Sequence, residues 1–187
     1  MDGTLGWLTK AFDTGFSVTF AEGLDARTLL LRMGCEPESI DWIDEVDCQG
    51  RQLDDDIVMI RAGVHGGWAF AVQAWGARAL EGGVMAAVSA GTRACTLVST
   101  MTIPWFAYWE DAEPICDFDP GMPSTRHGTA PDHLNPVMAQ VGLDPSPDAT
   151  GSTSVSGMLL LAERAFGVTL PYEAVFQGEL LGGVVPG

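Results

Sequence analysis

Hydrophobic and polar residues alternate in several short segments, and this pattern predicts strands. Residues 16–22, FSVTFAE, place large apolar side chains on one face and small side chains on the other. This two-residue period is typical of a strand with one buried face. The same reasoning predicts strands at 57–62, 68–75, 93–101, 105–110 and 113–118.

A pair of glycines joins two of these strands. Gly66 and Gly67 separate the runs 57–62 and 68–75, and glycine adopts the positive φ of a tight hairpin turn at no steric cost. His65 is then a turn residue with no local partner for catalysis. We therefore interpret HGGWAFAVQAWG as a turn that leads into a buried strand.

A second hairpin is predicted from strands 105–110 and 113–118, with its turn at Asp111 and Ala112. Its register places Glu110 opposite Glu113. Like charges that face each other across a hairpin cost up to about 1 kcal/mol. A basic partner or a cation at this hairpin tip would offset that cost.

Apolar residues at helical spacing predict a helix over 25–34, which Asp25 caps and Gly34 ends. Residues 36–56 are predicted to be a solvated acidic loop, and 144–153 a linker. Further helices are predicted at 3–13, 80–91, 131–142, 154–167 and 170–183.

Together these elements predict a single α+β domain over residues 1–187. A mostly antiparallel sheet of about five or six strands would be covered by helices. Residues 1–120 would supply the sheet, and residues 121–187 a loop and a helical C-terminal part that packs last.

The composition is that of a folded domain and restricts its partners. Hydrophobic residues make up 47% and charged residues 18% of the chain, and the formal net charge is −16. Nucleic acid and anionic membrane surfaces call for basic residues, so we expect neither as a partner. No apolar run reaches the ~18 residues of a membrane span. The N-terminus also lacks the pattern of a signal peptide, so we expect a cytoplasmic protein.

No motif predicts a cofactor. The chain contains no glycine-rich nucleotide-binding loop and no nucleophile elbow. Its four cysteines form no C-x-x-C pair and are predicted to be buried apolar residues in a reducing compartment. We therefore expect no bound cofactor and no bound metal.

One polar cluster offers an alternative, a small metal-assisted hydrolase. His127, Asp132 and His133 lie within seven residues, in RHGTAPDH. Two imidazoles and a carboxylate can hold a metal ion, or can supply a base and the group that orients it. The spacing is not the i, i+4 of metal ligands on a helix, which favours a polar loop.

The leading hypothesis is a non-enzymatic binding protein for a basic protein partner, and an immunity or inhibitor-type role against a basic enzyme would suit its charge. Region 36–56 carries nine acidic residues against one arginine, so it offers one acidic surface. The tip of the second hairpin offers the other. The candidate binding residues are Trp42, Asp54, Asp55, Asp56, Trp109, Glu110, Asp111 and Glu113.

The aromatic strand WFAYW, residues 105–109, carries large rings on both faces. One face is predicted to pack in the core. The other face is either covered by the C-terminal helices or exposed as a binding surface.

Several motifs taken together resemble a family of small bacterial proteins known only as a domain of unknown function. They are VTFAEGLDARTLLLRMG, GWAFAVQ, FAYWEDAE and LLLAERAFGVTL, and the resemblance covers roughly residues 16–176. The chain departs from the family pattern at Gln73, where an acid is usual, and at Ala112, where a turn glycine is usual. The resemblance implies no activity and no catalytic residue.

Overall fold

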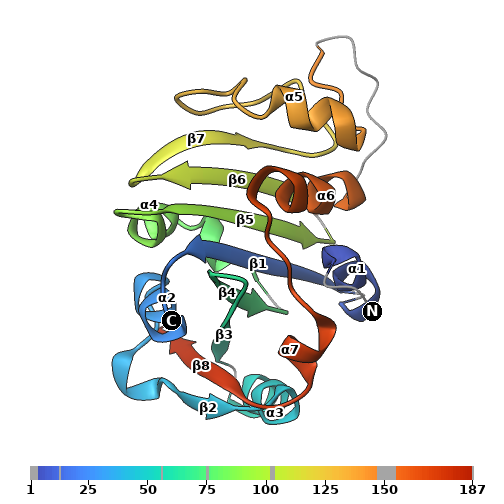
Figure 1. Cartoon of the computed structure of the whole chain (residues 1–187). Coiled ribbons are helices and arrows are strands. Elements are labelled where there is room, and N and C mark those ends of the chain that lie inside the picture. The colour runs from blue at the N-terminus through green and yellow to red at the C-terminus, as the bar shows by residue number, and fades with distance from the viewer. Residues whose placement is uncertain are drawn as a thin grey trace.

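The computed structural model describes residues 4–12, 14–55, 57–74, 76–101, 104–146 and 155–186, without the side chains of residues 54 and 55. In this part of the chain, eight strands form one antiparallel sheet in the order β2-β8-β3-β4-β1-β5-β6-β7 (Figure 1). The sheet is thus larger than the expected five or six strands. The strands are β1 Gly15–Glu22, β2 Asp41–Ile43, β3 Val58–His65, β4 Trp68–Gln73, β5 Arg93–Thr100, β6 Pro104–Glu110, β7 Glu113–Phe118 and β8 Leu180–Val185.

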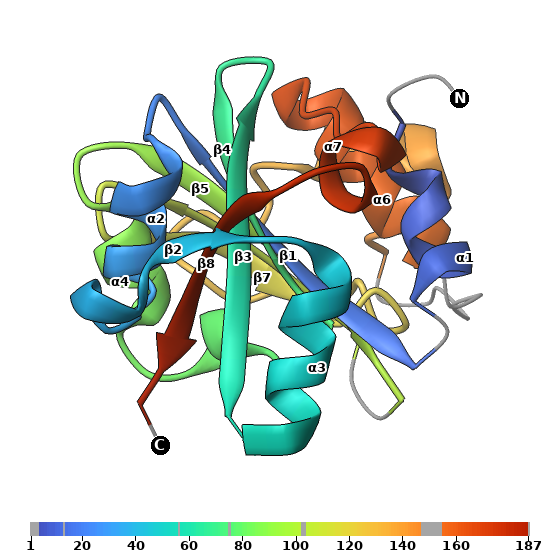
Figure 2. The ribbon, with the colours of Figure 1, turned by 90° about the horizontal axis from the view of Figure 1, so that it is seen from below.

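Helices cover both faces of the sheet. Figure 2 shows α2 and α4 on one side of the strands and α1, α6 and α7 on the other. The α-helices are α1 Leu8–Ala11, α2 Ala26–Arg32, α3 Glu45–Asp55, α4 Val84–Ser89, α5 Asn135–Met138, α6 Val155–Phe166 and α7 Tyr172–Phe176. Short 3-10 helices are η1 Leu5–Trp7, η2 Pro37–Ser39, η3 Arg78–Leu80 and η4 Ala139–Val141.

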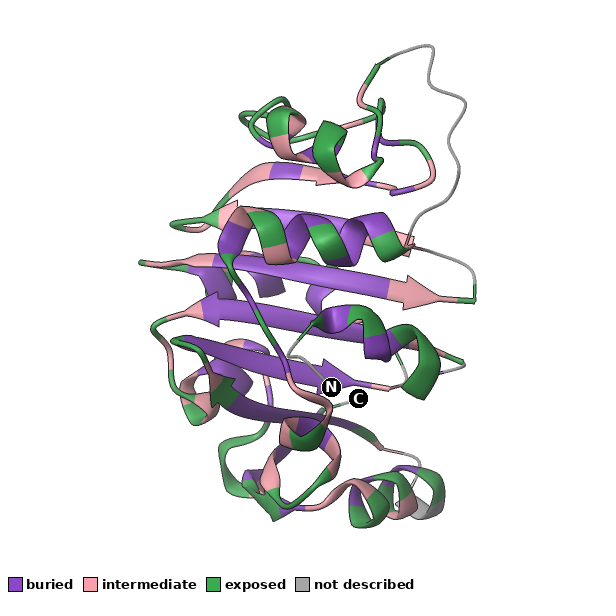
Figure 3. Ribbon diagram, turned by 45° about the vertical axis from the view of Figure 1, so that its right-hand side comes forward, coloured by how far each residue is buried: buried purple, intermediate pink, exposed green. Residues whose placement is uncertain are grey.

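The alternation within the strands produces two hydrophobic cores, one on each face. Phe16, Val18 and Phe20 of β1 belong to the larger core, together with buried residues of α1, α5, α6 and α7. Ala69 and Ala71 of β4 belong to the second core, beneath α2 and α4. Small side chains on this second face let the two helices approach the sheet closely. Figure 3 shows the central strands as almost entirely buried.

The glycine hairpin between β3 and β4 is confirmed. Gly66 and Gly67 have φ of 59° and 84°, values that suit a turn with positive φ at both central residues. His65 pairs with Trp68 beside this turn. The helix after β1 is also confirmed, because the Asp25 carboxylate accepts a hydrogen bond from the Thr28 backbone N–H at 2.7 Å.

The prediction of a solvated loop over 36–56 was wrong. Strand β2 and helix α3 occupy this region. Ile43 and Cys48 are buried against Met59 in a small core of their own. Apolar contacts thus help to hold an otherwise acidic segment against the end of the sheet, together with a hydrogen bond from the Met59 backbone N–H to the Gln52 side chain.

The prediction of a helix over 170–183 was also wrong, and the C-terminal part is not purely helical. Helix α7 ends at Phe176, and β8 then pairs with both β2 and β3 inside the sheet. A Cβ atom at Gly182 would lie 2.4 Å from Cγ2 of Ile43, and one at Gly183 would lie 2.8 Å from Cβ of Cys35. These glycines are needed because neighbouring side chains approach the strand backbone closely.

Two further helices are shorter than predicted. The helix expected over 80–91 begins only at Val84, because Gly83 has a φ of 81°. The helix expected over 131–142 is reduced to α5 and η4. The proposed linker 144–153 lies outside the described residues from position 147 onward. Within the described chain, no helix is long and apolar enough to cross a membrane.

Candidate functional site

Charged residues gather where three neighbouring strands end on the α6 side of the sheet. Glu22 is the last residue of β1, Arg93 the first of β5 and Glu110 the last of β6. Arg93 and Glu110 are direct cross-strand partners. Because β1, β5 and β6 are adjacent in the sheet, the three side chains form a row, called here the Glu22–Arg93–Glu110 row.

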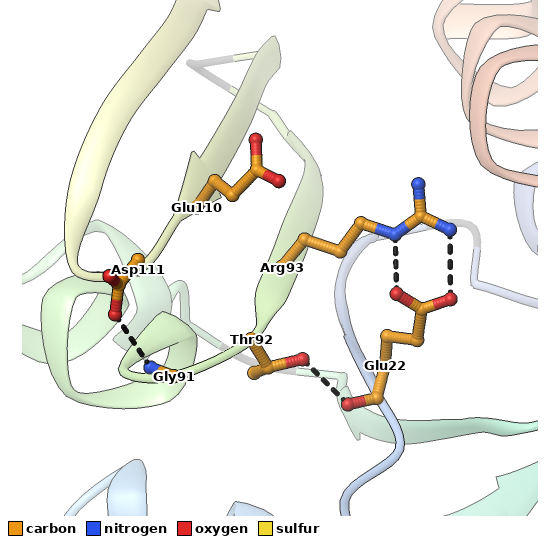
Figure 4. A pocket seen from close by; sticks show the side chains of 6 residues that line it. All are labelled: Glu22, Gly91, Thr92, Arg93, Glu110 and Asp111. Carbon is orange, nitrogen blue, oxygen red and sulfur yellow. Dashed lines mark hydrogen bonds and ion pairs between the residues drawn. The ribbon is translucent and has the colours of Figure 1, made fainter.

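An ion pair fixes one half of this row. The Arg93 guanidinium donates two hydrogen bonds to the Glu22 carboxylate, at 2.5 and 2.8 Å (Figure 4). This hydrogen bonding lowers the pKa of Glu22 below its usual 4.5 and raises the pKa of Arg93. The guanidinium carbon also lies 5.4 Å from the ring centre of Trp68, within the range of a cation–π contact.

Tyr108 supports the other half of the row. Its hydroxyl donates a hydrogen bond to the Glu110 carboxylate at 3.1 Å. Burial, with the Glu110 charge as the next largest cause, raises the pKa of Tyr108 to about 12. The Tyr108 ring packs 4.7 Å from Phe166 of α6 and 5.8 Å from His133. Glu110 is therefore held by a phenol and not by a cation.

The β6–β7 turn lies at Asp111 and Ala112, as the sequence predicted, and it borders the site. Asp111 and Ala112 have φ of 48° and 66°, unusual for residues other than glycine. The Asp111 carboxylate accepts a hydrogen bond from the Gly91 backbone N–H at 3.0 Å (Figure 4). The Ser89 hydroxyl accepts one from the Ala112 backbone N–H at 3.2 Å. The end of α4 and the loop before β5 thus hold the strained turn in place.

These residues line an open cavity of about 520 Å³. Its walls are Glu22, Gly91, Thr92, Arg93, Glu110 and Asp111. The cavity therefore contains three carboxylates and one guanidinium. Because the guanidinium is engaged by Glu22, the remaining surface is negative and suits a positively charged group.

The predicted hairpin-tip residues lie together, although they point to different sides. Glu110 faces Glu113 across the hairpin, as expected from the register. Trp109 is half-buried and packs against the core on the α4 face of the sheet. Phe106 and Tyr108, on the opposite face, are buried in the larger core. The aromatic strand is thus covered on one face and partly open on the other.

Trp42 lies far from this site, near the opposite edge of the sheet. Strand β2 is one edge and β7 the other. The Trp42 side chain is 62% exposed, and two other apolar residues nearby in the sequence are also exposed, Val46 at 77% and Leu53 at 70%. The other predicted residues of this surface, the side chains of Asp54 and Asp55 and the whole of Asp56, lie outside the described parts of the chain.

The residues of the alternative metal site have separate partners. The backbone of His127 pairs with Asp117 of β7, and Asp132 forms an ion pair with Arg126 at 2.7 Å. His133 stacks on Tyr108. Over the described residues, no group of three or more histidine, cysteine, aspartate or glutamate side chains is placed to hold a metal ion.

All four cysteines are buried and free of disulfides. Burial raises the pKa of Cys35 and Cys116 to about 12 and that of Cys48 to about 11. Burial also raises the pKa of Cys95. Such thiols are poor nucleophiles at neutral pH. We therefore interpret the four cysteines as small apolar residues of the core.

Glu22 and Arg93 were not singled out by the sequence reasoning. A signal was nevertheless present, because Glu22 continues the two-residue period of the apolar positions in β1. A charged residue in register with a buried face has to find a partner or lie at the strand end. The partner itself lies 71 residues away, and only the pairing of β1 with β5 identifies it.

The fold and the site define a class: an α+β protein with one antiparallel sheet, helices on both faces and a negatively charged cavity at the strand ends. A model of a family of unknown function, DUF6461, matches residues 4–187. The chain belongs to this family, and the expectation of a family of unknown function is confirmed. Neither the curated proteins nor the solved structures gave a match.

Proposed function

We propose that the protein is a non-enzymatic binding protein that engages a basic protein partner through the tip of the β6–β7 hairpin. The cavity of about 520 Å³ carries this proposal, because it holds three carboxylates and one arginine. That arginine is already paired with Glu22. Glu110 and Asp111 form no ion pair with any described residue, and Glu113 adds a third carboxylate at the tip.

The rigidity of the turn supports a recognition role. Hydrogen bonds from Gly91 and to Ser89 hold Asp111 and Ala112 in a backbone conformation that is costly for them. A surface that is fixed before binding loses little conformational entropy on association. The carboxylates are therefore presented in one arrangement, which favours a specific partner over loosely held counterions.

The net charge of −16 would steer a basic partner toward the protein over a distance of several ångströms. An immunity or inhibitor-type role against a basic enzyme would use both the long-range attraction and the fixed hairpin tip. Since exposed charges are screened beyond about 8 Å at physiological ionic strength, association should slow as salt rises.

A charge-matched comparison tests the proposal. The variant Glu110→Gln, Asp111→Asn, Glu113→Gln removes three charges at the tip. The control variant, Glu36→Gln, Glu38→Gln, Asp47→Asn, removes three charges at exposed positions of region 36–56, the other acidic surface, next to the β2 edge of the sheet. Wild type and both variants are immobilised and exposed to an extract of the native host at low and at high salt. Any captured protein is identified, purified and titrated by calorimetry.

We expect one basic protein to bind the wild type and the control variant but not the hairpin variant. Its binding to the wild type should weaken at high salt. Equal binding of the partner to both variants would show that the interface does not include the hairpin tip, and would contradict the proposal. No captured protein, or a neutral or acidic one, would contradict the proposed function.

A further inference from the structure

A second cleft lies on the other face of the β6–β7 hairpin. It has a volume of about 270 Å³ and lies between the hairpin and the segment from η3 to α4. Trp105 and Trp109 of β6 and Asp117 of β7 line one wall. Met85 and the Gly82–Gly83 pair belong to the other. None of these residues contributes to the cavity that contains the Glu22–Arg93–Glu110 row.

The register of the hairpin places a carboxylate between the two indoles. Asp117 is the direct cross-strand partner of Ala107, which lies midway between Trp105 and Trp109 on the same face of β6. Directly paired residues on one face of a sheet have Cβ atoms about 5 Å apart. Ala107 itself lines the cleft between the two indoles.

The Asp117 carboxylate has no hydrogen bond and no ion pair with any described side chain. The other carboxylate in the cleft, Glu81, is already paired with Arg78. Asp117 is half-buried, and burial raises its pKa, while the nearby His127 opposes the shift. A desolvated carboxylate without a partner is unfavourable for the fold, which a ligand would relieve.

The geometry points to a binding site for an organic cation, a guanidinium or alkylammonium group, held between Trp105 and Trp109 with Asp117 as its counter-ion. Indole faces attract such cations when the charge lies within about 6 Å of the ring centre. No described cation of the chain itself occupies this position, because the cation–π contact seen in the structure involves Arg93 and Trp68. The cleft is suited to one head group and does not depend on the proposed function.

The cation could be a free small molecule or the side chain of a peptide, and two probes distinguish these sources. Methylguanidinium represents the free cation, and the tripeptide Gly-Arg-Gly presents the same group on a backbone. Gly-citrulline-Gly is the neutral control of the same shape. Binding is followed by the shifts of the tryptophan indole N–H signals in two-dimensional NMR of the ¹⁵N-labelled protein at pH 8.

We expect the signals of Trp105 and Trp109 to shift and saturate with at least one cationic probe below about 10 mM, a range typical of small single-group ligands. Asp117→Asn should weaken this binding about tenfold, and Trp105→Leu should weaken it severalfold. Glu113→Gln, which removes an exposed charge on the same hairpin, should leave it unchanged. The tip variant used to test the proposed function should also bind normally.

The spectrum of each variant shows directly whether it is folded. Asp117→Asn should fold at least as well as the wild type, because burial disfavours the charged carboxylate. Equal shifts with the citrulline peptide, unchanged affinity in a folded Asp117→Asn variant, or no shift with either cation would overturn the proposal. A response to methylguanidinium alone would identify a free small molecule as the ligand, and a response to Gly-Arg-Gly would identify a peptide.

Discussion

Glu45, in the first turn of α3, forms an ion pair with Arg61 of β3, whose side chain is only 3% exposed. The Arg61 guanidinium also donates a hydrogen bond to the Val175 carbonyl at 3.1 Å. One buried arginine thus joins α3 and α7 to the sheet. Burial lowers the pKa of Arg61 to about 10, against the opposing effect of the Asp44 charge.

Removal of one partner of this pair should strongly destabilise the fold. Arg61→Met leaves the Glu45 carboxylate and the Val175 carbonyl without their donor, so we expect a loss of about 3–5 kcal/mol in the free energy of unfolding. Urea denaturation measures it. Arg51→Met, at an exposed position of α3, should change stability by less than about 0.5 kcal/mol. The double variant Glu45→Leu, Arg61→Met should recover part of the loss, because no charge is then left buried. Equal midpoints for Arg61→Met and Arg51→Met would contradict this role.

Gly128→Ala should also be destabilising. Gly128 has a φ of 116°, and a Cβ atom there would lie 2.4 Å from the Ile115 carbonyl oxygen. This glycine lies in the segment whose backbone hydrogen bonds cover the outer edge of β7. We expect a loss of about 1–3 kcal/mol in chemical denaturation. Gly50→Ala, inside α3 where the added Cβ meets nothing, should instead raise stability by up to about 1 kcal/mol. A neutral Gly128→Ala would show that the edge segment relaxes freely.

Ala112→Gly should stabilise the protein. The φ of 66° at Ala112 costs an alanine about 1 kcal/mol and a glycine almost nothing. The hydrogen bond from its backbone N–H to the Ser89 hydroxyl does not involve the methyl group and is retained. Thermal melts should show a higher midpoint. Ala87→Gly, the same change at an exposed position of α4, should lower it. If both variants lowered the midpoint, strain at Ala112 would not be the explanation.

The ion pair between Glu22 and Arg93 should make stability depend on acid pH. The hydrogen bonds from Arg93 lower the folded-state pKa of Glu22 below 4.5. The resulting stability is therefore fully present above pH 4.5 and is lost as pH falls through the folded-state value. We expect Glu22→Gln to be less stable than the wild type at pH 7 and the difference to shrink below pH 4.5. Arg93→Met should remove the same pH-dependent part. A difference that grows toward acid would contradict the assignment.

The sequence alone determined the elements whose signals are local. The period of β1, the cap that Asp25 gives to α2, and the glycine turn between β3 and β4 each depend on residues within a few positions of one another. The β6–β7 hairpin, with Glu110 opposite Glu113, was predicted correctly for the same reason. Two adjacent strands with a two-residue turn can pair in few ways.

Only the tertiary structure decided which distant segments meet. The predicted helix over 170–183 includes LLGG, yet these residues begin strand β8, because β2 and β3 offer free edges on both sides of it. The candidate sites depend on the same long-range pairing. Glu22 meets Arg93 because β1 and β5 are neighbours, and the cleft around Asp117 forms because α4 packs beside β6 and β7. Strands can pair by backbone hydrogen bonds whatever their separation in the sequence. Burial and steric fit across the whole chain therefore select one arrangement, which a local sequence pattern does not reveal.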